Sequence, residues 1–257
     1  MSDTPSFLTT PSGYALAYHR FSSGEPTVVF CHGYGSSMRG DKALAMEQAC
    51  RQWGISFVRF DLSGCGESAG DFASATMQRW RDDALQIIDQ LTAGPLVLVG
   101  SSMGAWLMVL IATARPHRIA ECFGIAAAPD MTDYKFAHGL TELQRQTLQD
   151  EGVIYFDNSS GEPSIPLYKS LMDSGSHMRV LETAINLPIP LTLVHARDDS
   201  DVPWQRSQIL QTLWAVASCE LTLLPQGGHR LSDEQSINTL LETLQRIVHR
   251  VLPSDDD

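Results

Sequence analysis

The feature that most constrains this chain is a turn between two apolar runs, within Leu96–Leu110 (LVLVGSSMGAWLMVL). Leu96–Val99 is an uninterrupted apolar run, which is typical of a buried strand. Ala105–Ala114 is a longer apolar run and is predicted to be a helix packed against a sheet. A G-x-S-x-G sequence separates the two runs, so we expect a strand, a sharp turn and a helix in succession.

The turn gives Ser102 an unusual position. Only small neighbours let a strand and a helix approach so closely, and Gly100 and Gly104 supply them. We expect the strained turn to lift the Ser102 hydroxyl above the carboxyl edge of the sheet. It would also place the Met103 N–H at a helix start, where it can stabilise a negative oxygen. The pattern by itself is not specific, because a turn of small residues also closes ordinary α/β units.

Strands and helices alternate along most of the chain. A hairpin is predicted over residues 7–21, with its turn at Ser12-Gly13. The other predicted strands are Thr27–Cys31, Ile55–Phe60, Leu96–Val99, Cys122–Ala127, Leu191–Ala196 and Glu220–Leu224. The other predicted helices of the alternating part are Ala43–Trp53, Thr76–Leu91, Trp204–Val216 and Asp233–Val251. This alternation predicts one α/β domain over residues 1–257, with a mostly parallel sheet and helices on both faces.

The alternation breaks between about residues 130 and 187. Helices are predicted at Thr141–Asp150 and Tyr168–Leu181, with a short apolar run at Val153–Phe156 and a turn cluster at Asp157–Gly161. A segment of this length inside a compact domain is more often functional than a plain connection. We therefore expect a small lid over the sheet edge; the alternative is a long crossover.

Composition limits the partners and the compartment. The chain has 30 Asp and Glu against 18 Lys and Arg, and its net charge of −12 disfavours nucleic acid and anionic membranes as partners. Its five cysteines are scattered, so neither a disulfide framework nor a zinc site is expected. No apolar run is long enough to span a bilayer, and the first residues lack a secretory signal pattern. These features predict a cytoplasmic protein without a transmembrane segment and leave the oligomeric state open.

A serine hydroxyl is a weak nucleophile until a base removes its proton, so Ser102 needs partners from other strand ends. His229 follows the last predicted strand and a Gly-Gly pair, which lets its loop bend back toward the sheet edge. The base needs an orienting carboxylate, and Asp198, Asp199 and Asp201 all follow the preceding strand. Nucleophile, acid and base thus come in the order Ser, Asp, His, each at a strand end.

A tetrahedral intermediate of acyl transfer needs two donors for its oxyanion. We predict that these are the N–H of Met103 and the N–H of Tyr34, which lies in the glycine-rich turn after the first central strand. His32 in that turn is interpreted as a structural residue that holds the loop by a side-chain hydrogen bond, rather than as a metal ligand. Structural roles are also expected for His195, Asp61 and Cys65.

Five stretches resemble the α/β-hydrolase superfamily of serine hydrolases, and they occur in the family order: VVFCHGYGSS, FDLSGCGES, LVGSSMGAW, LVHARDDSDVPW and GGHR. The resemblance covers nearly the whole chain. The family's acid motif, H-G-x-x-D-x-x-V-P, aligns with His195–Pro203, where Ala196 replaces the usual Gly. This alignment selects Asp199 as the acid. The resemblance implies an α/β-hydrolase fold with Ser102, Asp199 and His229 as its triad.

A closer resemblance is to one branch, the palmitoyl-protein thioesterases that also cleave acyl glucuronides. The similar stretches include RFDLSGCGESAGDF, WRDD, GPLVLVGSSMGAWLM and ARPHRI. The branch implies a short lid and substrates that are S-acylated cysteines of proteins or acyl-sugar esters.

The sequence therefore predicts a serine hydrolase that cleaves esters or thioesters through an acyl-enzyme, with no cofactor or metal. Two alternatives remain: a carbon–carbon bond hydrolase with the same triad, and a non-catalytic hydrolase-like binding protein. Epoxide hydrolases and haloalkane dehalogenases are disfavoured, because their chemistry places a carboxylate where Ser102 stands. Apolar residues that either line an acyl pocket or simply pack are Trp106, Met103, Tyr34, Tyr155, Phe156 and Leu167.

Overall fold

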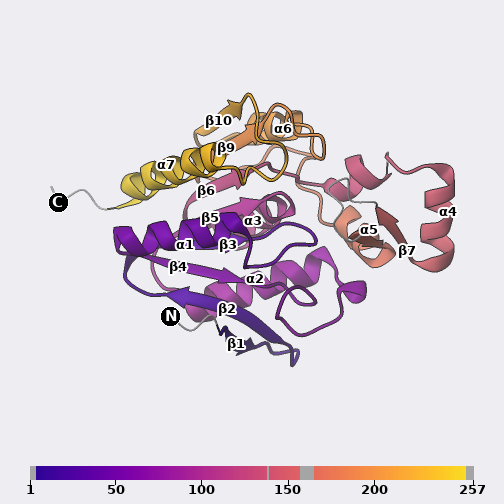
Figure 1. The fold of residues 1–257 in the computed structure, drawn as a ribbon, viewed down its shortest axis with the longest axis horizontal. Coiled ribbons are helices and arrows are strands. Elements are labelled where there is room, and N and C mark those ends of the chain that lie inside the picture. The colour runs from indigo at the N-terminus through magenta and orange to yellow at the C-terminus, as the bar shows by residue number, and fades with distance from the viewer. Residues whose placement is uncertain (1–3, 138, 157–164, 253–257) are drawn as a thin grey trace.

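The computed structural model describes residues 4–137, 139–156 and 165–252 (Figure 1). Within these residues the main sheet has eight strands in the order β1-β2-β4-β3-β5-β6-β9-β10. The strand bounds are Ser6–Thr9 (β1), Ala15–Phe21 (β2), Gly24–Cys31 (β3), Ile55–Phe60 (β4), Leu96–Ser101 (β5), Ile119–Ile125 (β6), Leu191–Ala196 (β9) and Cys219–Leu224 (β10). β2 is antiparallel to both of its neighbours, and the pairs from β4 to β10 are parallel. The predicted α/β-hydrolase fold is confirmed.

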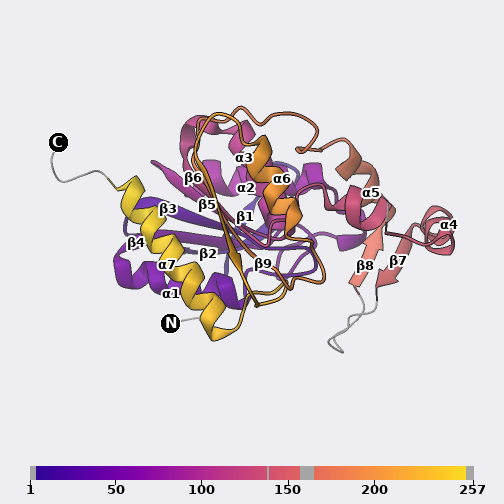
Figure 2. The ribbon, with the colours of Figure 1, turned by 90° about the horizontal axis from the view of Figure 1, so that it is seen from above.

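Helices cover both faces of the sheet (Figure 2). One face carries α1 (Asp41–Trp53) and α7 (Glu234–Val251), and the other carries α2 (Met77–Leu91), α3 (Met103–Ala114) and α6 (Gln205–Leu213). Successive residues of a strand point to opposite faces, so each central strand contributes to both cores. In β5, for example, Leu98 packs on the α2–α3 side and Val97 on the α1–α7 side. Burial on both faces explains why this strand is apolar throughout.

The N-terminal hairpin is confirmed, with β1 and β2 joined by a turn in which Gly13 has a φ of 84°. Two predicted helices are shorter than expected. The helix predicted at Trp204–Val216 ends at Leu213, because the next residue, Trp214, forms a parallel bridge with Ile185.

The segment between residues 130 and 187 lies beside the main sheet, at the carboxyl ends of the parallel strands (Figure 1). It contains a π-helical turn (Thr132–Ala137), α4 (Glu142–Glu151), β7 (Val153–Phe156), β8 (Ile165–Tyr168) and α5 (Lys169–Ser176). β7 and β8 pair as a separate antiparallel sheet. The predicted turn cluster Asp157–Gly161 lies outside the described residues. We call residues 130–187 the lid; its assignment as an insertion in a single domain stays a prediction.

Hydrogen bonds hold the lid together and also tie it to the main body. Helix α5 ends at Ser176 rather than at the predicted Leu181. The reason is Asp130, whose two carboxylate oxygens accept the N–H groups of Val180 and Leu181, each at 2.9 Å. The Trp106 indole N–H donates to the Met178 carbonyl at 2.9 Å. Trp106 is therefore a buried anchor for the lid, and not a free wall of a pocket.

Candidate active site

Ser102 occupies the sharp turn between β5 and α3. Its φ of 56° and ψ of −120° lie in a region that residues other than glycine rarely adopt. A Cβ at Gly100 would lie 2.4 Å from the Gly104 carbonyl oxygen, and one at Gly104 would lie 2.1 Å from the Cys31 carbonyl oxygen. The predicted steric reason for both glycines is therefore borne out. The strained turn holds the serine at the carboxyl end of β5.

His229 reaches Ser102 from the loop after β10. Its Nε2 lies 2.9 Å from the Ser102 Oγ, and its Nδ1 lies 2.8 Å from the Asp199 Oδ2. A carboxylate only accepts hydrogen bonds, so Nδ1 carries the hydrogen and Nε2 accepts from the Ser102 hydroxyl. The side chain is 20% exposed, so solvent reaches the imidazole.

The loop that carries His229 is held by Asp198, one of the three predicted candidates for the acid. Its carboxylate accepts the N–H of Gly228 at 2.9 Å and faces that of Gly227 at 3.4 Å. Gly228 has a φ of 57° and Gly227 a φ of 136°, which explains the Gly-Gly pair. On the other side of the loop, the Lys42 ammonium group donates to the Arg230 carbonyl. Asp198 and Lys42 thus position the base from outside, a role that the sequence did not reveal.

Asp199 is the carboxylate that contacts His229, as the acid motif indicated. Its side chain has no exposed area. Besides the histidine contact, its Oδ1 accepts the N–H groups of Asp201 at 2.9 Å and Val202 at 2.8 Å. Burial alone would raise the pKa of Asp199, but hydrogen bonds from His195 and His229 outweigh burial and hold the pKa below its usual value. Asp199 is therefore ionised at neutral pH.

His195 also contacts Asp199 directly. It is fully buried at the end of β9, and its Nε2 lies 3.0 Å from the Asp199 Oδ2. We predicted a structural role for this histidine, but its contact with the acid of the triad was not foreseen. The spacing of four residues between the two gave no signal, because it has no fixed meaning in a loop.

The two predicted oxyanion donors come from the start of α3, directly after Ser102, and from the loop after β3. Within the described part of the chain, neither the Met103 N–H nor the Tyr34 N–H has a hydrogen-bond acceptor. Gly33, which precedes Tyr34, lies against Ser102: a Cβ added to it would be 3.2 Å from the Ser102 Cβ. Both N–H groups are thus free to bind a substrate oxygen beside the nucleophile.

His32 sets the direction of the Tyr34 N–H. Its Nε2 accepts the Leu62 N–H at 3.3 Å, so its Nδ1 carries the hydrogen and donates to the Gly33 carbonyl at 2.8 Å. This carbonyl and the Tyr34 N–H belong to one trans peptide group and point in opposite directions. The predicted structural role of His32 is confirmed. Burial lowers the pKa of His32, which keeps the ring neutral.

The loop after β4 is fixed as expected. Asp61 accepts the N–H of Met38 at 2.6 Å and of Glu67 at 2.8 Å, so it ties its own loop to the loop after β3, which carries Tyr34. Cys65 is buried, and burial raises the pKa of its thiol to about 12, so it is an inert filler.

Aromatic rings pack around Tyr34, in the loop after β3. The Tyr34 ring lies 5.3 Å from that of Phe72, and Phe72 lies 6.1 Å from the lid residue Tyr168. Of the other residues considered for an acyl pocket, Met103 and Leu167 are buried, and Tyr155 is 61% exposed. Tyr34 also binds the lid, since its hydroxyl donates to the Pro166 carbonyl at 2.5 Å.

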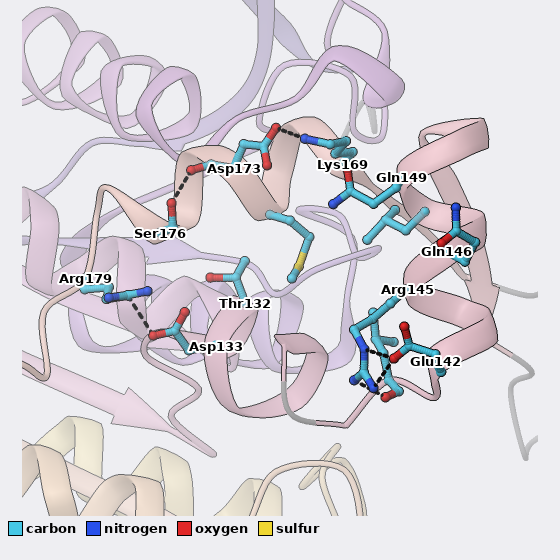
Figure 3. Close-up of a pocket in the computed structure, with 13 residues that line it drawn as sticks. Thr132, Asp133, Glu142, Arg145, Gln146, Gln149, Lys169, Asp173, Ser176 and Arg179 are labelled. Atoms are coloured by element: carbon cyan, nitrogen blue, oxygen red, sulfur yellow. Dashed lines mark hydrogen bonds and ion pairs between the residues drawn. The ribbon is translucent and has the colours of Figure 1, made fainter.

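A hollow of about 430 Å³ lies in the lid between α4, α5 and the π-helical turn (Figure 3). Leu140, Leu148 and Met172 give it apolar surface, and charged side chains such as Arg145, Lys169 and Arg179 surround it. Neither the triad nor the oxyanion donors line this hollow. It is therefore a feature of the lid and separate from the Ser102 site.

The chain matches known proteins over nearly its full length. The model of the alpha/beta hydrolase family matches residues 28–237. The rat protein named palmitoyl-protein thioesterase ABHD10, mitochondrial, is 34% identical over 96% of this chain and 84% of its own. The human protein of that name is 33% identical over 96% of this chain and 80% of its own. The predicted resemblance to palmitoyl-protein thioesterases is confirmed.

Solved structures agree with these relatives. Alpha/beta hydrolase domain-containing protein 10 from mouse is 33% identical, with a TM-score of 0.89 over 97% of this chain and 100% of that chain. A putative hydrolase from Agrobacterium vitis S4 is 28% identical, with a TM-score of 0.91 over 95% of this chain and 98% of that chain.

The prediction of a cytoplasmic location is wrong. The rat, mouse and human relatives are all named mitochondrial. That prediction drew on reduced cysteines and on the lack of a secretory pattern, and these features do not distinguish the two compartments. Among the described residues, no helix has both the length and the apolar character needed to cross a membrane.

Proposed function

Because this chain belongs to the alpha/beta hydrolase family, we propose that it hydrolyses carboxylic esters or thioesters with Ser102 as nucleophile, His229 as base and Asp199 as orienting acid. The observation that carries this proposal is the unbroken hydrogen-bond relay. It runs from the Ser102 Oγ to the His229 Nε2 at 2.9 Å and from the His229 Nδ1 to the Asp199 Oδ2 at 2.8 Å.

The reaction proceeds in two halves. The Ser102 Oγ attacks the acyl carbon while its proton moves to the His229 Nε2, and the carbonyl oxygen becomes an oxyanion held by the N–H groups of Met103 and Tyr34. The intermediate collapses, and the alcohol or thiol leaves with the proton from His229. Water then attacks the acyl-enzyme with His229 as base, which releases the carboxylic acid and restores the Ser102 hydroxyl.

We further propose that the substrates carry a long acyl chain as a thioester, as in an S-acylated protein. Two observations support this substrate class. The relatives at 33% and 34% identity are named palmitoyl-protein thioesterases. The aromatic rings of Tyr34, Phe72 and Tyr168 provide apolar surface beside the loop after β3, which carries the proposed oxyanion donor Tyr34. An acyl-sugar ester is the alternative substrate.

The test compares rates on nitrophenyl esters from acetate to palmitate and on an S-palmitoylated peptide. We expect Ser102→Ala to lower every rate by roughly 10,000-fold or more. Ser176→Ala is a matched control, because the hydroxyl of this lid serine donates to the Asp173 carbonyl and contacts none of the three proposed triad residues among the described residues. A rate that survives in Ser102→Ala would overturn the mechanism. A wild-type enzyme that cleaves only short esters would overturn the long-chain substrate and leave the triad standing.

A further inference from the structure

We propose that His195 is a positioning residue, whose neutral imidazole donates to Asp199 and thereby weakens the pull of this carboxylate on the His229 proton. The inference rests on the proposed triad and adds a second histidine to it. His195 touches neither Ser102 nor a substrate; it acts through Asp199.

The hydrogen bonds of the His195 ring determine where its proton lies. Nε2 is 3.0 Å from the Asp199 Oδ2 and 3.0 Å from the Val202 carbonyl oxygen, and both atoms only accept hydrogen bonds. Nε2 therefore carries the hydrogen. Nδ1 lies 2.7 Å from the Ser207 Oγ, whose hydroxyl is free to donate to it.

A neutral ring satisfies all of these partners with a single proton. His195 and Ser207 both have 0% exposed area, so a second proton on the ring would place an additional charge in the core. The Asp199 carboxylate and the Val202 carbonyl thus select the tautomer with the hydrogen on Nε2, and the Ser207 hydroxyl, which comes from α6, satisfies Nδ1 by donating to it. Two elements of the main body, β9 and α6, fix the direction of this bond.

Asp199 consequently receives four donors. Its Oδ2 is shared by the His229 Nδ1 at 2.8 Å and the His195 Nε2 at 3.0 Å, while two backbone N–H groups occupy Oδ1. Each donor takes up part of the carboxylate's negative charge and lowers its basicity. The protonated form of the His229 ring is then stabilised less than it would be beside a carboxylate with fewer hydrogen-bond donors.

Other ionisable groups around this network have different partners. The Asp198 carboxylate binds the N–H groups of Gly227 and Gly228. Tyr134, which faces Asp199 from the π-helical turn, has its pKa raised by burial and is neutral when the enzyme works.

Lys42 lies beside the His229 loop, and burial lowers its pKa to about 8. Lys42 therefore titrates at higher pH than an ordinary histidine, and its contribution can be separated. Further charged groups nearby are Asp130, Asp201, Arg206 and Arg230.

The test measures the pKa of the His229 ring by NMR, with the signal assigned by its loss in His229→Gln, together with the pH profile of kcat/KM. We expect His195→Leu, which removes the donor, to raise the pKa of His229 and the acid limb of the profile by roughly half a unit to one unit. His195→Gln keeps an N–H donor and should restore most of this shift. Ser207→Ala frees Nδ1 and should give a smaller shift in the same direction.

A matched control on the same strand is Thr192→Val, which removes a buried hydrogen bond to Glu121 far from the triad. It should leave the pKa of His229 unchanged. If His195→Leu does not fold, the shift in Ser207→Ala decides the question.

Folded variants in which His229 titrates as in the wild type, whatever their rate, would overturn the inference. The NMR readout does not depend on turnover, so this failure is distinct from failure of the proposed function, which would appear as activity that survives Ser102→Ala.

Discussion

The triad and the lid lie close together, yet different contacts hold them. Ser102, Asp199 and His229 lie in loops after three parallel strands, and the Asp199 carboxylate is buried with its four donors at 2.8 to 3.0 Å. The lid carries exposed ion pairs instead, such as Arg145–Glu142, whose side chains are 46% and 86% exposed (Figure 3). An exposed ion pair adds about 0–1 kcal/mol to the free energy of unfolding. A buried charge that loses its partner lowers this free energy by roughly 3–5 kcal/mol.

Because of this difference, we expect the sheet edge to determine the chemical step and the lid to determine which substrate binds. Few substitutions around Asp199 should be tolerated, because each one that removes a hydrogen-bonding group leaves its buried partner without a hydrogen bond. The lid is joined to the body by hydrogen bonds and by apolar packing, since Leu167 and Leu171 lie in the same buried cluster as Trp106. Changes at the sheet edge should therefore affect the rate of the chemical step, and changes in the lid should affect stability or substrate binding by small amounts.

The largest effect is expected for Asp199→Asn. The amide cannot accept from both histidines and favours the wrong tautomer of His229, so kcat should fall by roughly 10,000-fold. Initial rates on a nitrophenyl ester measure this loss. Asp173→Asn in the lid is the matched control, because it breaks only an exposed pair with Lys169. A loss below about tenfold in Asp199→Asn would show that Asp199 does not orient the base.

Two glycines provide the next comparison. In Gly104→Ala the new Cβ would lie 2.1 Å from the Cys31 carbonyl oxygen, so β3 and α3 must separate. We expect a loss of roughly 3 kcal/mol or more in the free energy of unfolding. Gly152→Ala, at the end of α4 in the lid, meets no atom within 4 Å and is strained only by its φ of 77°. It should cost about 1 kcal/mol. Urea denaturation of both variants measures the difference; equal losses would refute the close packing at the elbow.

The pH dependence of stability also distinguishes the two regions. Because the pKa of Asp199 is lowered in the folded protein, its contribution is complete above its unfolded pKa, about 3.9, and is lost as the pH falls through the folded value. The stability gap between wild type and Asp199→Asn should therefore be constant near neutral pH and should shrink below about pH 4. Denaturation midpoints recorded across this range test the sign; a gap that widens in acid would contradict it.

Tyr34→Phe probes the connection between the regions. It removes the hydroxyl that donates to the Pro166 carbonyl but keeps the ring next to Phe72 and the backbone N–H. We expect a loss of about 1 kcal/mol in stability and faster proteolysis of the lid, with kcat reduced less than tenfold. A kcat loss as large as that of Asp199→Asn would mean that the lid contact also sets the oxyanion hole.

The smallest effect is expected for Lys169→Ala. This side chain pairs with Asp173 on the lid surface at 2.6 Å, and the two side chains are 34% and 60% exposed. Stability should change by less than about 1 kcal/mol, and kcat should not change. A thermal melt and an ester assay suffice, and a large loss in either would show that the lid is less tolerant than its contacts indicate.

Much of the fold was predictable because its signals are local. The apolar run Leu96–Val99 and the two glycines of the elbow specify a buried strand and a sharp turn through sterics alone. The end of α5 was not predictable, because Asp130 determines it from a distance. Neither was β8, which contains Pro166 and pairs with a strand several residues earlier in the chain.

The candidate site divides in the same way. The order of residue types along the chain was enough to identify Ser102, His229 and a cluster of three aspartates after predicted strands, and the family motif then selected Asp199. The contact of Asp198 with the His229 loop and the hydrogen bond from His195 to Asp199 became visible in the folded chain. The physical reason is that turn and strand preferences act between neighbours in sequence. A hydrogen bond across the sheet edge depends on where distant loops meet.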